Sequence, residues 1–299
     1  MIPAPLRQGD RIAVVSPSGI IAPERVFGAM QVIADEGFEP IAMPHAFDRC
    51  GTMAGTDAAR LSDLRSAFID PDIKAVFCSR GGYGAVRLLE ELNTLPSAAL
   101  SKWLIGYSDI TALHALLSSR GIASLHGPMA RHLSEQRGSD PCVRELFNIL
   151  RGEAPQPVEY PTPRFYYPGT ATGILRGGNL SVMAGLAGTP YDPFLPGSIL
   201  IMEDIAEPIY KVERILYMLR LSGKLRHLAG IIFGQFTLYD PSRDFATMEE
   251  MLHRMTVRLG IPVATNFPAG HVTANRPLLL NTPATLHVTP STCRLSYPT

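Results

Sequence analysis

Short apolar runs alternate with longer amphipathic stretches along the first 125 residues of the chain. Apolar residues at helical spacing predict helices, and short apolar runs bounded by turn residues predict buried strands. Strands that alternate with helices of ten or more residues form βαβ units with a parallel sheet. The expected strands are 11–16, 39–43, 74–78, 103–106 and 122–125, and the expected helices are 23–37, 57–69, 83–92 and 109–119.

Residues 152–172 differ in composition, because five prolines fall within this stretch. Proline lacks a backbone N–H and is excluded from helix interiors and central strands, so we interpret 154–172 as an extended linker. The alternating pattern then resumes, which predicts an α/β protein with two domains, residues 1–153 and 173–299. The expected later strands are 173–175, 198–202, 229–233, 263, 278–281, 284–288 and 294–297, and the expected helices begin at 179, 208 and 247.

Composition excludes several classes of protein. The 299 residues are 46% hydrophobic and 18% charged, so the chain can bury a large core and is not globally disordered. The formal net charge is zero, which favours neither nucleic acid nor an anionic membrane as a partner. Four scattered cysteines without a CxxC pair indicate reduced thiols, and no signal-like segment opens the chain. We therefore expect a soluble cytoplasmic protein.

A serine, Ser108, follows the apolar run 103–106, and a helical pattern begins directly after it. Ligand sites of open α/β sheets lie beyond the carboxyl ends of the strands. A serine at a strand-to-helix turn there resembles a nucleophile elbow, with its hydroxyl exposed. The usual elbow reads G-x-S-x-G, and Ile110 stands where the second glycine is expected. A plain helix N-cap is the alternative interpretation.

The glycine-rich turn after residues 74–78 has three possible roles. Gly81 and Gly82 lie between an expected strand and an expected helix. Their backbone N–H groups are compatible with a phosphate site, with an oxyanion hole, or with a tight turn that has no ligand. The turn has neither the GxGxxG pattern of dinucleotide-binding proteins nor the Lys-Ser/Thr ending of a P-loop.

Two further polar residues have the chemistry that a nucleophilic serine requires. Glu203 ends the apolar run 198–202, and His271 follows Gly270 in a segment without helical period. In chain order Ser108, Glu203 and His271 would supply a nucleophile, an acid that orients the base, and a base. The backbone N–H groups of Gly82 and Asp109 would then bind the oxyanion. The histidines have no metal-ligand spacing, so we expect no catalytic metal and no cofactor.

Eight segments of the chain occur together in a characteristic order: 11–19, 79–84, 105–113, 126–128, 177–180, 202–204, 214–216 and 270–271. With these segments in this order, the chain resembles the LD-carboxypeptidase family over nearly its whole length. The resemblance implies a serine hydrolase with a Ser108–Glu203–His271 triad and an oxyanion hole at Asp109 and Gly82, or Gly81. It implies an amino-terminal domain like class I glutamine amidotransferases, a smaller carboxyl-terminal α/β domain and a cytoplasmic homodimer. The implied substrate is the murein tetrapeptide, cleaved before its terminal D-alanine.

Two alternatives remain open at this point. A related branch of the family, with the same triad, cleaves peptidyl-nucleotide antibiotics, and a non-catalytic binding protein with the amidotransferase-like domain is also compatible with the pattern. Guanidinium groups bind carboxylates with two parallel hydrogen bonds, so arginines are candidates for holding the substrate carboxylate. The substrate-binding candidates are Arg80, Arg131, Arg176, Gly81, Tyr83 and His126.

Overall fold

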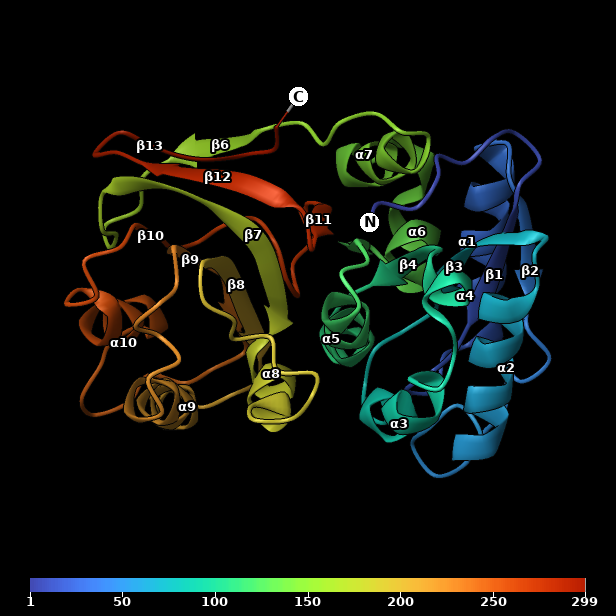
Figure 1. Ribbon diagram of the computed structural model, residues 1–299, viewed down its shortest axis with the longest axis horizontal. Coiled ribbons are helices and arrows are strands. Elements are labelled where there is room, and N and C mark those ends of the chain that lie inside the picture. Colours follow the sequence, from blue (N-terminus) through green and yellow to red (C-terminus); the bar gives the residue numbers. More distant parts are fainter. Residues whose placement is uncertain (299) are drawn as a thin grey trace. The chain divides into compact units, whose positions relative to one another are not determined.

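The computed structural model describes residues 1–298 and divides them into two compact units. Unit 1 comprises residues 1–155 and 276–279, and unit 2 comprises 156–275 and 280–298. Each unit contains one β-sheet with helices packed against it (Figure 1). The α/β class predicted from the alternation is confirmed.

Unit 1 is built around a six-stranded sheet. Its elements are β1 (Arg11–Val15), α1 (Pro23–Asp35), β2 (Glu39–Ala42), α2 (Asp57–Ile69), β3 (Ile73–Cys78), α3 (Leu89–Leu92), α4 (Ser97–Leu100), β4 (Trp103–Gly106), α5 (Thr111–Ser119), β5 (Ser124–His126), α6 (Ala130–Gln136), α7 (Pro141–Leu150) and β11 (Leu278–Leu280), with short 3-10 helices at Ala85–Leu88, Ser108–Ile110 and Arg137–Ser139. The strand order is β11-β5-β4-β3-β1-β2, and strands β1 to β5 pair in parallel.

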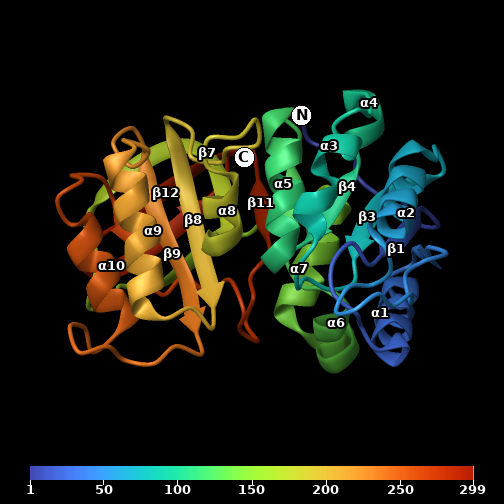
Figure 2. The ribbon, with the colours of Figure 1, turned by 90° about the horizontal axis from the view of Figure 1, so that it is seen from below.

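The order of these strands creates a switch point between β1 and β3. The chain runs from β1 outward to β2, then returns past β1 to β3 and continues to β4 and β5. Helices α1 and α6 therefore cover one face of the sheet, and α2 and α3 cover the other (Figure 2). In such sheets the loops at a switch point diverge and leave room for a ligand. The loops after β1, β3 and β4 are the natural place for a site in this unit.

Unit 2 contains a seven-stranded sheet in the order β10-β9-β8-β7-β12-β13-β6. Its elements are β6 (Val158–Pro161), β7 (Gly169–Asn179), α8 (Leu180–Leu186), β8 (Ser198–Ile205), α9 (Ile209–Leu221), β9 (Gly230–Thr237), α10 (Met248–Thr256), β10 (Val263–Ala264), β12 (Pro283–Val288) and β13 (Thr292–Ser296). Strands β7 to β10 are parallel, and β12, β13 and β6 extend the sheet in antiparallel pairs. The apolar faces of α8, α9 and α10 bury a cluster that includes Leu180, Leu216 and Met251.

Several elements differ from the sequence expectations, among them helices α4, α6 and α7, which were not predicted. The proline-rich stretch 154–172 holds β6 and the start of β7, and β6 occupies a sheet edge, where proline is tolerated. The helix expected over 83–92 is a 3-10 helix followed by the single turn α3, since Gly84 has φ +123°. Residues 276–279 pack in unit 1, although their expected place was the second domain.

Within residues 1–298, every helix is too short or too polar to span a bilayer.

Candidate active site

The loops after β1, β3 and β4 contact one another at the switch point of unit 1. The backbone N–H of Gly19, after β1, donates to the carbonyl of Gly81, after β3, at 3.0 Å. Gly81 in turn packs against the first residues after β4. A β-carbon added to Gly81 would lie 2.8 Å from the Ser108 Cβ and 3.3 Å from the Asp109 nitrogen. This approach is too close for any side chain, which explains a glycine at position 81.

Ser108 has a left-handed backbone conformation, with φ +64°. Residues other than glycine rarely have positive φ, and holding one there costs on the order of 1–3 kcal/mol. Ser108 is the N-cap of neither the 3-10 helix nor α5, because those positions belong to Tyr107 and Ile110. A serine in a strained turn between a strand and a helix matches the geometry of a nucleophile elbow, although Ile110 replaces the second glycine.

The side chain of Asp109 has contacts that the sequence did not indicate. Its Oδ2 accepts hydrogen bonds from the Ser18 hydroxyl at 2.6 Å and from the Ala85 backbone N–H at 2.9 Å. Only 4% of the residue is exposed. From the sequence, only the backbone N–H of Asp109 was expected to take part in the site. The serine in the loop after β1 was the available signal for its side-chain partner.

Two buried histidines lie behind the elbow. The ring nitrogens of His114 lie 2.8 Å from the Gly106 carbonyl and 2.8 Å from the Ser124 hydroxyl. Burial lowers the pKa of His114 to about 4, and the hydrogen bond with the Gly106 carbonyl only partly opposes this change. The ring of His126 is fully buried, 5.7 Å from the Tyr107 ring. Burial favours a packing role for His126 over the pocket-lining role expected from its position at a strand end.

Unit 2 brings Glu203 and His271 together. Glu203 lies near the carboxyl end of β8 and is fully buried, and its Oε2 is 2.8 Å from Nδ1 of His271. Burial raises the pKa of the Glu203 carboxyl, while the hydrogen bond with His271 acts in the opposite direction. A neutral imidazole donates from one nitrogen and accepts at the other. With Nδ1 donating to the carboxylate, Nε2 of His271 carries the lone pair that can take a proton.

The backbone around this pair is shaped for close approach. Gly270, which precedes the histidine, has φ +117°, and a β-carbon added there would lie 2.8 Å from the Glu203 Oε2. Its N–H donates to the Asn275 side chain at 2.9 Å. The neighbouring carboxylate, Asp204, accepts from the Asn179 amide and from Ser181, and thereby holds the turn between β7 and α8. Asp204 therefore has a structural role.

The candidate arginines have different surroundings. Arg80 donates to the Ile20 carbonyl in the loop after β1. Arg131 is exposed on α6, where it pairs with Glu135 at 3.1 Å. Arg176 donates at 2.9 Å to Ser198, the first residue of β8, and so its guanidinium lies at the end of that strand opposite to Glu203. Burial lowers the pKa of Arg176.

Tyr83 is the exposed member of the glycine-rich turn. Its side chain lies beside the turn with 56% of the residue exposed, and the guanidinium of Arg87 lies 5.2 Å from the centre of the ring. Because it is exposed, this ring can contact a ligand, whereas the buried aromatic rings of the unit cannot.

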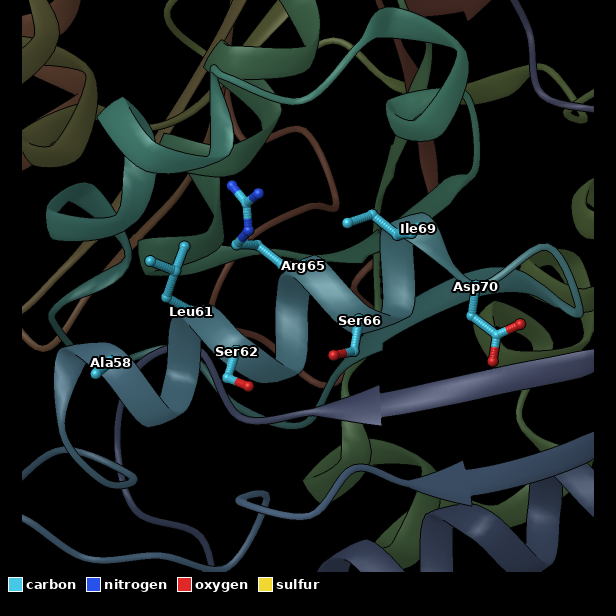
Figure 3. Close-up of a pocket in the computed structure, with 7 residues that line it drawn as sticks. All are labelled: Ala58, Leu61, Ser62, Arg65, Ser66, Ile69 and Asp70. Carbon is cyan, nitrogen blue, oxygen red and sulfur yellow. The ribbon is translucent and has the colours of Figure 1, made fainter.

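A surface groove of about 580 Å³ lies elsewhere, along one side of α2 (Figure 3). It is lined by Ala58, Leu61, Ser62, Arg65, Ser66, Ile69 and Asp70. Its arginine donates to the Glu91 carbonyl and to Thr94. The lining contains no residue from a strand end, so the groove is not our candidate site. Over residues 1–298, histidine, cysteine, aspartate and glutamate form no group of three that could hold a metal ion.

Comparisons with known proteins cover both units. Residues 12–127 match the family model of the LD-carboxypeptidase N-terminal domain, and residues 172–286 match that of the C-terminal domain. The chain is 33% identical to a murein tetrapeptide carboxypeptidase of Pseudomonas aeruginosa, over 89% of each chain. A crystal structure of muramoyltetrapeptide carboxypeptidase from Oxalobacter formigenes has a TM-score of 0.84 at 31% identity, covering 97% of this chain and all of that one.

A second group of solved structures shares the fold at lower identity. The microcin C7 self-immunity protein MccF, in complex with glutamyl sulfamoyl guanosine, has a TM-score of 0.85 at 24% identity, covering 99% of this chain and 98% of that chain. This likeness extends to the fold alone.

Proposed function

Since the chain belongs to the LD-carboxypeptidase family, we propose that it is a serine peptidase that removes the terminal D-alanine from murein tetrapeptides. The observation that carries the proposal is the buried Glu203–His271 hydrogen bond, which joins residues 68 positions apart. A carboxylate that orients an imidazole is the arrangement by which hydrolases prepare a general base for a serine. The identity to the Pseudomonas aeruginosa enzyme supports the substrate class.

In the proposed reaction, Ser108 Oγ attacks the carbonyl carbon of the L,D-peptide bond while Nε2 of His271 takes the hydroxyl proton. The N–H groups of Asp109 and Gly82, or Gly81, bind the oxyanion of the tetrahedral intermediate. Collapse breaks the C–N bond, and D-alanine leaves as its amine takes the proton from the imidazolium. Water, activated by the same imidazole, then hydrolyses the acyl-enzyme.

The carboxylate of Glu203 stabilises the imidazolium that forms in each half of this cycle. Its burial removes water that would otherwise weaken the interaction. The same burial raises the pKa of Glu203, so the hydrogen bond with His271 is needed to keep the ionised form favourable.

Four finer proposals accompany this function. These are the cytoplasmic location, the homodimer, the likeness of unit 1 to class I glutamine amidotransferases, and a division of labour in which unit 1 carries the nucleophile and unit 2 carries the acid and base. Size-exclusion chromatography with light scattering tests the dimer directly.

The test of the proposed function is release of D-alanine from free tetrapeptide, measured by mass spectrometry. The purified protein is expected to release it, with no loss of rate in the presence of a chelator. Ser108→Ala is expected to lower kcat by at least about 10³-fold, because the nucleophile is removed. Ser119→Ala is the matched control, since that hydroxyl only donates to the Leu116 carbonyl at the end of α5. Near wild-type turnover in Ser108→Ala would contradict the mechanism.

The same assay separates the alternatives. An aminoacyl-nucleotide is incubated in parallel with the tetrapeptide. Cleavage of the nucleotide substrate with none of the tetrapeptide would assign the chain to the antibiotic-cleaving branch. Binding of either compound without turnover would favour the non-catalytic protein.

A further inference from the structure

We propose that the Asp109 side chain is a positioning residue for the oxyanion hole, a role that rests on the proposed function and is separate from that of its backbone N–H. In this proposal the carboxylate holds the glycine-rich turn after β3 against the turn that carries Ser108. The two backbone donors thereby keep the spacing that the tetrahedral intermediate requires.

The first observation is that one carboxylate oxygen connects three loops. Oδ2 of Asp109 accepts from the Ser18 hydroxyl, 91 positions earlier in the chain, and from the Ala85 N–H, 24 positions earlier. Ser18 belongs to the loop after β1, and Ala85 is the first residue after the glycine-rich turn. The elbow, the turn and the loop after β1 are thus tied to a single buried oxygen.

The second observation is that the start of the glycine-rich turn also packs against the elbow. Gly81 has no space for a β-carbon, since such an atom would lie 2.8 Å from the Ser108 Cβ. The Gly81 carbonyl is fixed at 3.0 Å by the N–H of Gly19. The turn is therefore held at both ends, by Gly81 at its start and by Ala85 at its end. Gly82, the predicted oxyanion donor, lies between these fixed points.

The chemistry explains why this matters for the rate. Oxyanion donors act through their fixed positions, and an error of about 1 Å in the placement of a reacting group can reduce the rate by about 10²-fold. A carboxylate suits the task because it only accepts hydrogen bonds, so a hydroxyl and an N–H can share it. Without the carboxylate, the Ser18 hydroxyl and the Ala85 N–H would be buried without this acceptor, and the end of the turn would have no anchor.

The test uses the full-length enzyme and the tetrapeptide assay. Asp109→Ala is expected to lower kcat by about 10²-fold with KM changed by less than about threefold, because the loss falls on the transition state. Asp109→Asn keeps an acceptor oxygen and is expected to recover kcat to within about tenfold of wild type. Ser18→Ala removes one of the two hydrogen bonds and is expected to lower kcat by about three- to tenfold.

Asp63→Ala is the matched control. Asp63 is also buried, with 3% of the residue exposed, and accepts a backbone N–H, that of His45. It has no contact with the elbow among its hydrogen bonds, so its loss is expected to lower the melting temperature and leave kcat of the folded enzyme unchanged. If Asp109→Ala does not fold, Ser18→Ala and Asp109→Asn decide the question. Folded variants with wild-type kcat, or with a change confined to KM, would overturn the proposal.

A fluorophosphonate separates this inference from the proposed function. Ser108 Oγ forms a bond to phosphorus, fluoride leaves with the electron pair, and His271 takes the serine proton; the phosphonyl oxygen then occupies the oxyanion hole. If the wild-type enzyme is labelled but does not cleave the tetrapeptide, the proposed substrate is wrong, and the labelling rates still test the positioning role of Asp109. Asp109→Ala is expected to label about 10²-fold more slowly by intact-mass measurement. Equal labelling rates would overturn the positioning role, whereas no labelling of wild type would contradict the nucleophilic serine of the proposed function on which that role rests.

Discussion

The two units prepare their parts of the predicted triad by different physical means. In unit 1 the important features belong to the backbone: Ser108 has a positive φ, and Gly81 packs without space for a β-carbon. In unit 2 they belong to side chains, because the Glu203 carboxylate and the His271 imidazole form a buried pair.

This difference determines how each region can fail. A backbone site is fixed by sterics and hydrogen bonds, so it is disturbed by added atoms and by the loss of an anchor such as Asp109. A buried ionisable pair is fixed by charge, so it is disturbed by substitutions and pH values that change its protonation. Mutations and pH can therefore separate the two regions experimentally.

The largest expected effect is on the side-chain pair. Glu203→Gln retains the shape of the side chain but removes the charge that stabilises the imidazolium, and its amide can donate to Nδ1 and favour the wrong tautomer. We expect kcat to fall by about 10⁴-fold, as for the equivalent change in another serine hydrolase. Steady-state release of D-alanine measures it. A loss below about tenfold would show that Glu203 does not orient the base.

A smaller loss is expected from adding one methyl group to the backbone site. Gly81→Ala places a β-carbon 2.8 Å from the Ser108 Cβ, so the turn and the elbow must separate. We expect kcat to fall by about 10²-fold. Gly185→Ala is the control, because position 185 lies in α8 with open space around it and alanine favours helix. Equal kcat in the two variants would contradict the close packing proposed for the elbow.

The smallest expected effect is on the pH dependence of stability, and its direction is opposite for the buried groups of the two units. Burial lowers the pKa of His114 to about 4 from an ordinary 6.5, so the unfolded chain binds a proton first as the pH falls. The contribution of His114 is complete above pH 6.5 and is lost as the pH falls toward 4, by at most about 3 kcal/mol. The raised pKa of Glu203 acts in reverse: stability is lost as pH rises from the ordinary carboxyl value through the folded one.

Thermal unfolding between pH 4 and 8 tests these signs. His114→Gln is expected to reduce the loss of stability on acidification, and Glu203→Gln is expected to reduce the loss on the alkaline side. Unchanged pH profiles in both variants would show that other groups dominate the pH dependence.

Sequence patterns predicted the architecture where the signal is local. The buried strand 103–106 and the start of the amphipathic helix expected from 208 were predicted to within a residue, because hydrophobic periodicity reports which side of an element is buried. The helix expected over 83–92 was wrong in its first part, since Gly84 takes a positive φ that the apolar pattern does not report. Residues 276–279 belong to unit 1, and nothing in their own composition indicates this.

The sequence by itself determined the α/β alternation, the strand-to-helix turn at Ser108, and the order of serine, glutamate and histidine along the chain. Only the tertiary structure decided that Glu203 and His271 form a hydrogen bond and that the Asp109 carboxylate joins Ser18 to Ala85. The reason is physical: periodicity and turn chemistry depend on neighbouring residues, whereas these contacts depend on how strands far apart in the chain lie side by side in a sheet.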